Sequence, residues 1–107
     1  MRFVTIGYGD QAGYDSTDAA TRDAAHEHDA RLQRSGVVMG RAGEPVQVRN
    51  HQATGTITKT GPFLSSGLPV AGFAVIEAPT LADAVELASQ APCAVAGGVV
   101  EVWPLQD

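Results

Sequence analysis

The fold of this chain is decided by residues 70–92, which read VAGFAVIEAPTLADAVELASQAP. Their first eight residues are the most apolar run of the chain and predict a central β-strand, Val70–Glu77. Thr80 and Asp83 then have the spacing of a capping box, in which a hydroxyl and an acidic side chain satisfy free backbone donors at a helix start. Apolar residues recur every three or four positions after it. The stretch therefore predicts a strand followed by an amphipathic helix that ends before Pro92.

A second strand and helix are predicted in the first third of the chain. Residues 3–8 alternate their side chains with a period of two, which indicates a strand. Residues 15–18 supply capping groups for a helix over 19–35, which Gly36 ends. Further short apolar runs predict strands at 37–39, 46–49, 55–59 and 99–103, with a hairpin turn around 50–52.

The order strand, helix, strand, strand, helix, strand predicts the fold class. It is typical of a ferredoxin-like α+β fold, an antiparallel sheet with two helices on one face. At 107 residues we expect a single domain, 1–107, with one core. Because the other sheet face also carries Val, Ile, Phe and Trp side chains, we expect a second copy to cover it in a homodimer.

Composition and charge exclude several classes of function. The net charge is −5 with only seven Lys and Arg residues, so we expect no binding to nucleic acid. No segment approaches the roughly 20 apolar residues of a membrane span, and we expect no membrane association and a cytoplasmic location. Cys93 is the single cysteine, which cannot form an internal disulfide and is expected to be a small buried residue.

The most informative candidate residue is His28, on the first predicted helix. Every fourth residue over 20–32 lies on one stripe, and His28 interrupts this apolar stripe where it packs on the sheet. A histidine there is either a structural residue with a hydrogen-bond partner or a pocket residue that acts as a general base or binds a ligand. We predict Asp10 as its partner, with Tyr8 beside it at the end of the first strand.

Three patterns predict no site. His26 and His28 point about 200° apart on a helix, so they cannot bind one metal ion together. Residues 7–13, GYGDQAG, do not match a dinucleotide loop, because the third glycine is one residue late and no helix is expected to open at once. No Gly-x-Ser-x-Gly elbow surrounds Ser65. We therefore expect neither a metal nor a cofactor.

Several short motifs occur in a fixed order along the chain: Tyr8-Gly9-Asp10, Leu32, Gly36, Gly61-Pro62-Phe63, Gly72-Phe73 and Val100-Glu101-Val102. Their order and spacing resemble the YCII-related domain, also called the DGPF family, over almost the whole chain. The resemblance implies a dimeric α+β barrel, in the group that includes muconolactone isomerases and small monooxygenases. The family has no settled activity. The resemblance further implies a His and Asp pair in a pocket and an association with sigma factors of the extracytoplasmic-function type.

The chain departs from the family pattern where charge is concerned. Thr60 stands where an acidic residue usually precedes the Gly-Pro-Phe triplet, and residues 64–68, LSSGL, hold no charge. The first-helix histidine of some relatives falls at Ala25, so neither neighbouring histidine inherits its role by position.

Two functions remain. The favoured one is a non-catalytic dimeric module that binds a small molecule or a protein, such as a transcriptional regulator, through the sheet edge and the loop 64–69. The alternative is a cofactor-free enzyme that uses His28, Asp10 and Tyr8 for proton transfer. The residues predicted to bind the ligand are Gly61, Pro62, Phe63, Ser65 and Phe73.

Overall fold

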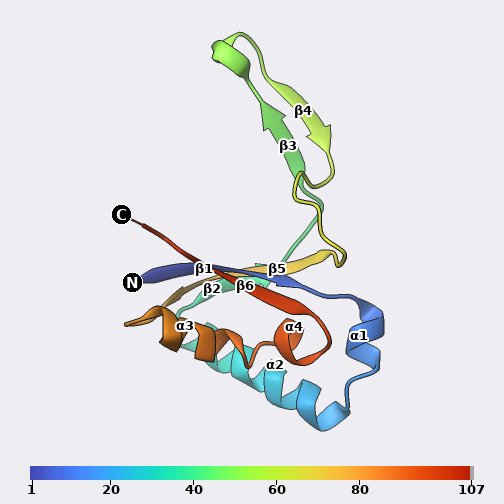
Figure 1. Ribbon diagram of the computed structural model, residues 1–107, viewed down its shortest axis with the longest axis vertical. Helices are drawn as coiled ribbons and strands as arrows, with labels where there is room; N and C mark the ends of the chain where they lie inside the picture. Colours follow the sequence, from blue (N-terminus) through green and yellow to red (C-terminus); the bar gives the residue numbers. More distant parts are fainter. Residues whose placement is uncertain (107) are drawn as a thin grey trace.

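The computed structural model describes residues 1–106 and has a sheet layer and a helix layer (Figure 1). The main sheet is antiparallel with the order β2-β5-β1-β6. Its strands are β1 (Arg2–Tyr8), β2 (Val38–Arg41), β5 (Val70–Glu77) and β6 (Val99–Pro104). This order is the ferredoxin-like one, so the predicted α+β class is confirmed. Within one chain the sheet is open and does not close into a barrel.

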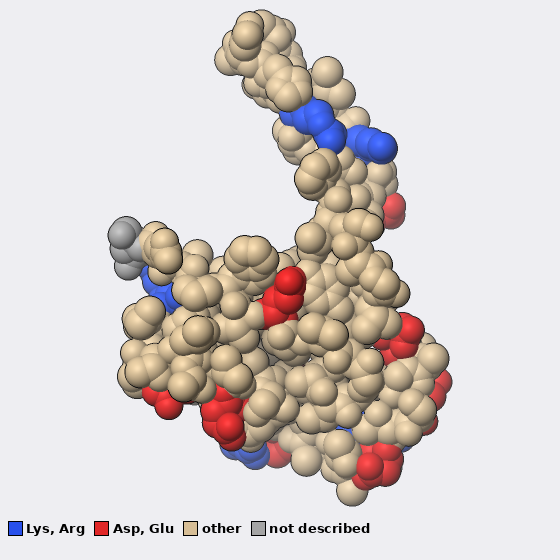
Figure 2. Space-filling model, viewed as in Figure 1, with Lys and Arg blue, Asp and Glu red and all other residues tan. Residues whose placement is uncertain are grey.

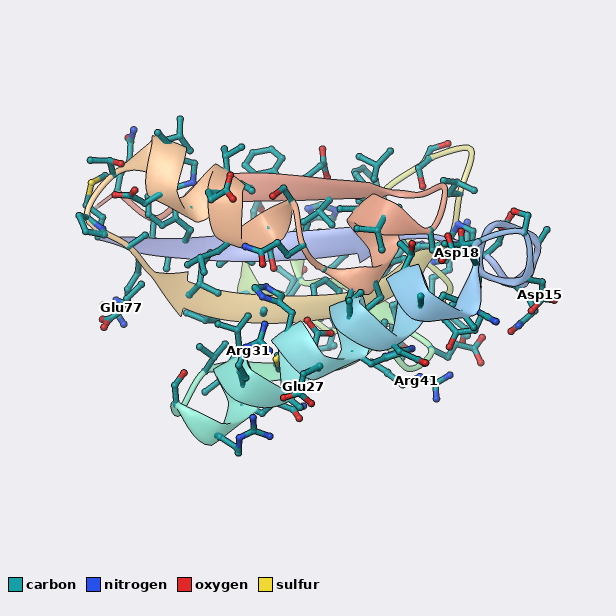
Figure 3. All side chains as sticks on the ribbon, turned by 90° about the horizontal axis from the view of Figure 1, so that it is seen from below. Asp15, Asp18, Glu27, Arg31, Arg41 and Glu77 are labelled. Carbon is teal, nitrogen blue, oxygen red and sulfur yellow. The ribbon has the colours of Figure 1, made fainter. Side chains whose placement is uncertain are left out.

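The helices cover one face of this sheet, as the view from the helical side shows (Figure 3). They are α2 (Ala19–Arg34), α3 (Leu81–Ala88) and the short α4 (Pro92–Val95). The core lies between the layers, where the helix-facing residues of the central strands are buried: Phe3, Ala74 and Ile76, with Ala78 and Ala84 from the second half of the chain. Phe3 is the largest side chain that is completely buried. The core is therefore built mainly from small side chains.

The helix starts follow the predicted capping signals. The Asp18 carboxylate accepts a hydrogen bond from the Thr21 N–H at 3.0 Å and begins α2. The Thr80 hydroxyl accepts from the Asp83 N–H at 3.1 Å and donates to the Asp83 carboxylate at 2.9 Å. In this box the carboxylate thus accepts from the hydroxyl of the capping residue. Gly36, at φ +98°, ends the α2 segment in the left-handed region that suits glycine.

A short helix, α1 (Gln11–Asp15), opens directly after β1, and the expectation that no helix opens there is wrong. The reason is local, because the Asp10 carboxylate caps it by accepting from the Gly13 N–H at 2.9 Å. Gly13 itself is required by packing, since a Cβ there would lie 2.5 Å from the Ala96 carbonyl oxygen. The glycine is thus explained without a bound nucleotide.

The predicted hairpin is present and projects from the body as an arm (residues 46–60) on the side away from the helices (Figure 1). Its strands β3 (Val46–Arg49) and β4 (Ile57–Thr60) form a separate two-stranded sheet, joined through the 3₁₀ turn η1 (His51–Ala53). The turn is longer than predicted, because the Asn50 side chain accepts from the Gly55 N–H and delays the start of β4. The radius of gyration is 15.7 Å, against about 13 Å for a compact chain of this length.

The face of the main sheet opposite the helices is apolar and open. Val38, Phe73, Val75 and Trp103 lie on it with 38% to 73% of their surfaces exposed. No helix within residues 1–106 is long and apolar enough to cross a membrane.

Candidate functional site

A cleft of about 650 Å³ lies between α2 and the main sheet. Small residues of the strands line its sheet side: Gly7, Gly40, Ala71, Gly72 and Ala74. Because Gly7, Gly72 and Ala74 occupy helix-facing positions and carry at most one side-chain carbon, they leave space between the strands and the helix. The volume falls in the range of about 300–1,000 Å³ that is usual for small-molecule sites.

The polar feature that distinguishes this cleft is Asp29, on the inner side of α2. Its Oδ1 atom is buried and has no hydrogen-bond partner among the described residues. Burial raises the pKa of the Asp29 carboxyl above its ordinary value, although the nearby His28 and His26 act in the opposite direction. Asp29 therefore offers an unmet acceptor at the wall of the cleft.

His28 borders the same cleft and is 5% exposed. Its Nε2 atom lies 2.9 Å from the Leu87 carbonyl oxygen, and because a carbonyl only accepts, the imidazole donates this hydrogen bond. The bond joins α2 to α3 across the core. The histidine is therefore satisfied structurally, while its predicted part in binding or proton transfer stays a prediction.

The other two predicted catalytic residues have different partners. Asp10 also borders the cleft, yet its carboxylate caps α1. Tyr8 follows the alternation of β1 to the open face, where its hydroxyl donates to Glu101 Oε1 at 2.5 Å. This hydrogen bond, with burial and the charge of Glu101, raises the pKa of Tyr8 to about 12. The predicted hydrogen bond between His28 and Asp10 is thus not formed, because each side chain is used by its own local structure.

Most of the residues predicted to bind a ligand lie outside the cleft. Gly61, Pro62, Phe63 and Ser65 are at the base of the arm. Phe73 alone of this group borders the cleft, and its side chain lies on the open face of the sheet. Gly61, at φ +106°, closes the hairpin by donating its N–H to the Pro45 carbonyl at 3.0 Å. Phe63 is 82% exposed, with the Arg49 guanidinium 5.8 Å from the centre of its ring. The Gly61-Pro62-Phe63 triplet is therefore part of the base of the arm, where it contacts residues of the hairpin.

Sequence reasoning missed Asp29 and the pair formed by Tyr14 and His26. The signal for Asp29 is its helical spacing, since it lies one turn beyond the buried Ala25. The Tyr14 hydroxyl lies 2.9 Å from His26 Nε2, and both residues border the cleft. This pair depends on α1, which the sequence did not predict, so no sequence signal could have placed it.

Cys93, on α4, is half-buried at the cleft and so is less buried than predicted. Gly7 makes room for it, because a Cβ on residue 7 would lie 3.0 Å from the Cys93 sulfur. Burial raises the pKa of the Cys93 thiol, and the negative charge of Asp29 adds to this effect. A protonated thiol is a poor nucleophile, so the surroundings favour Cys93 as a wall residue.

No group of three or more His, Cys, Asp or Glu side chains within residues 1–106 is arranged to hold a metal ion. Comparison with curated proteins gives no match. The family model of the YCII-related domain, in contrast, matches residues 1–106, which is nearly the whole chain. The resemblance carried by the short motifs is thereby confirmed, and the chain belongs to the YCII-related domain family.

Proposed function

We propose that this protein is a homodimeric module that binds a small molecule in the cleft between α2 and the main sheet. The observation that carries the proposal is the Asp29 carboxylate, which borders a cleft of about 650 Å³ with one buried oxygen that has no partner among residues 1–106. A buried acceptor of this kind is costly, and a ligand that donates a hydrogen bond removes the cost.

The composition of the cleft indicates the chemistry of the ligand. Its walls include Leu32, Met39 and Ile76 in addition to the small strand residues, so a largely apolar body fits. The buried Asp29 oxygen would accept a hydrogen bond from an N–H or O–H group of the ligand. The ligand class is therefore a small, mainly apolar molecule with one amine or hydroxyl donor.

The test compares paired probes that differ only in the donor, namely phenol with anisole and aniline with N,N-dimethylaniline. Each is added at millimolar concentration, and the thermal unfolding midpoint is measured. A ligand at ten times its Kd stabilises the fold by about 1.4 kcal/mol. We expect phenol and aniline to raise the midpoint more than their methylated partners do.

Two variants test whether Asp29 causes this difference in the unfolding midpoint between the paired probes. Asp29→Asn should remove the preference for the donor-bearing probes. Asp23→Asn, a matched change at an exposed position of the same helix, should keep it. If each probe pair shifts the midpoint equally in the unchanged protein, the proposed site is wrong.

The homodimer is proposed from the surface that one chain leaves exposed. The accessible surface is 7239 Å², whereas a monomer of 11.1 kDa is expected to expose about 5,700 Å². The excess exceeds the ~800 Å² per partner that a stable interface needs. The open sheet face supplies an apolar surface for this purpose, and two such faces would together form a dimeric α+β barrel.

Light scattering tests this part. The expected mass is twice the 11.1 kDa of the chain. Val75→Glu, which places a charge on the open face, should give the monomer mass with the circular dichroism spectrum unchanged. A monomeric unchanged protein at micromolar concentration would refute the homodimer.

A further inference from the structure

One face of the arm is apolar and uncovered. Val46 pairs with Thr60 across the hairpin and Val48 pairs with Thr58, so these four side chains share a face. All four are β-branched and uncharged, and Val46 and Val48 are 57% and 65% exposed. An isolated two-stranded hairpin is marginally stable in water. A face with this composition is typical of a strand pair that packs on another surface.

The charge of the arm differs in sign from that of the body. Residues 46–60 hold Arg49 and Lys59 and no acidic residue, whereas the rest of the chain holds twelve acidic and five basic residues. Figure 2 shows the basic side chains on the arm and acidic side chains spread over the body. The body of another copy therefore presents charge complementary to the arm.

The direction and length of the arm decide which part of a second copy it can reach. The arm rises on the same side of the main sheet as the open apolar face (Figure 1). The eight steps along the nine residues from Ala42 to Asn50 span at most about 26 Å when the chain is extended. A sheet stacked on the open face would lie about 10 Å away. The arm is thus long enough to pass the sheet of the second copy and reach its helix layer.

We propose that the arm of each copy clasps the body of the other. The face formed by Val46, Val48, Thr58 and Thr60 packs on the second copy, whereas Arg49 and Lys59 lie on the opposite face and attract the acidic body of that copy at longer range. The exchange of two arms gives a symmetric interface, in which each copy provides the same two surfaces. This inference rests on the proposed homodimer and adds a second contact to the stacked sheets.

Two matched substitutions test the clasp by sedimentation of the dimer. Val48→Asp places a charge on the packed face, and Ile57→Asp makes the same change in charge and hydrophobicity on the opposite face, at a residue that is 62% exposed. We expect Val48→Asp to raise the dissociation constant of the dimer at least tenfold. Ile57→Asp should raise it by a factor of about 3 or less, which is the effect of the added charge alone.

Equal effects of the two substitutions would overturn the clasp. If Val75→Glu separates the copies while Val48→Asp does not, the homodimer stands and the clasp fails. If the unchanged protein is monomeric, both proposals fail together.

Limited trypsin digestion tests independently whether the arm is covered in the dimer. Trypsin cleaves after Arg49 and Lys59, and both bonds are in the arm. In the clasped dimer these cleavages should be at least tenfold slower than in the monomeric Val75→Glu variant, because the arm is covered. Cleavage at the same rate in both proteins would show that the arm is free and would overturn the proposal.

Discussion

Replacing Asp29 by Asn should stabilise the protein at neutral pH, although most substitutions destabilise proteins. Burial disfavours the charged form of Asp29, and an unpaired buried charge costs more than the about 1–3 kcal/mol of a neutral polar group, which is what the Asn amide would be. Because the Asp29 side chain is only partly buried, we expect a gain in the free energy of unfolding of about 0.5–1 kcal/mol. For a chain of this length that gain corresponds to about 2–4 °C in the unfolding midpoint.

The pH dependence of this gain follows from the direction of the pKa shift. Burial raises the pKa of Asp29 in the folded state above its ordinary value of 3.8. The folded state therefore holds the proton more tightly, and the protein loses stability as the pH rises from about 4 through the folded-state pKa. The neutral Asn side chain does not titrate, so the gain should be near zero at pH 3 and complete at pH 7.

Differential scanning calorimetry from pH 3 to pH 7 measures this difference, with Asp23→Asn as the control on the exposed face of the same helix. The control should stay within about 0.5 kcal/mol of the unchanged protein. An Asp29→Asn variant that is less stable than the unchanged protein at pH 7 would refute the reasoning. So would a gain that is as large at pH 3 as at pH 7.

Three further predictions follow from other contacts. Glu101→Gln should lower the pKa of Tyr8 from about 12 toward its ordinary value of 10, which the ¹³C shift of the tyrosine ring carbon measures; an unaltered titration would contradict the hydrogen bond to Glu101. Because the folded state of the unchanged protein keeps the Tyr8 proton to a higher pH than the unfolded state does, its stability should fall between pH 10 and about pH 12. Gly72→Ala should lower the free energy of unfolding, measured in urea, by about 1–3 kcal/mol, because its Cβ would lie 2.7 Å from a backbone oxygen of β2. The control Gly43→Ala has no atom within 4 Å of the new Cβ and should change this free energy by less than about 0.5 kcal/mol. His28→Ala should lower the free energy of unfolding in the same assay by about 2–3 kcal/mol, because the buried ring and its hydrogen bond are lost. A decrease below about 0.5 kcal/mol would show that the contact between α2 and α3 does not stabilise the fold.

The amino-acid sequence alone determined most of the elements and their order, because these depend on local chemistry; the two short helices α1 and α4 were not predicted. The capping groups at Asp18 and Thr80 and the apolar run of β5 act within a few residues of chain, so their positions can be read without the fold. The hairpin was predicted for the same reason. The short helix α1 was missed because Gly7, Gly9 and Asp10 were interpreted only as the break that ends the first strand.

The tertiary structure alone decided which side chains meet. His28 was identified as unusual from its helical spacing, but its partner is a carbonyl on α3, 59 residues further along the chain. The cleft depends on small residues from separate strands lying together under α2, and on Asp29 being left there without a partner among residues 1–106. The direction of the arm depends on how β2 and β5 leave the sheet. A sequence pattern records periodicity within one element, whereas a site and a surface arise from distances between elements, which only packing sets.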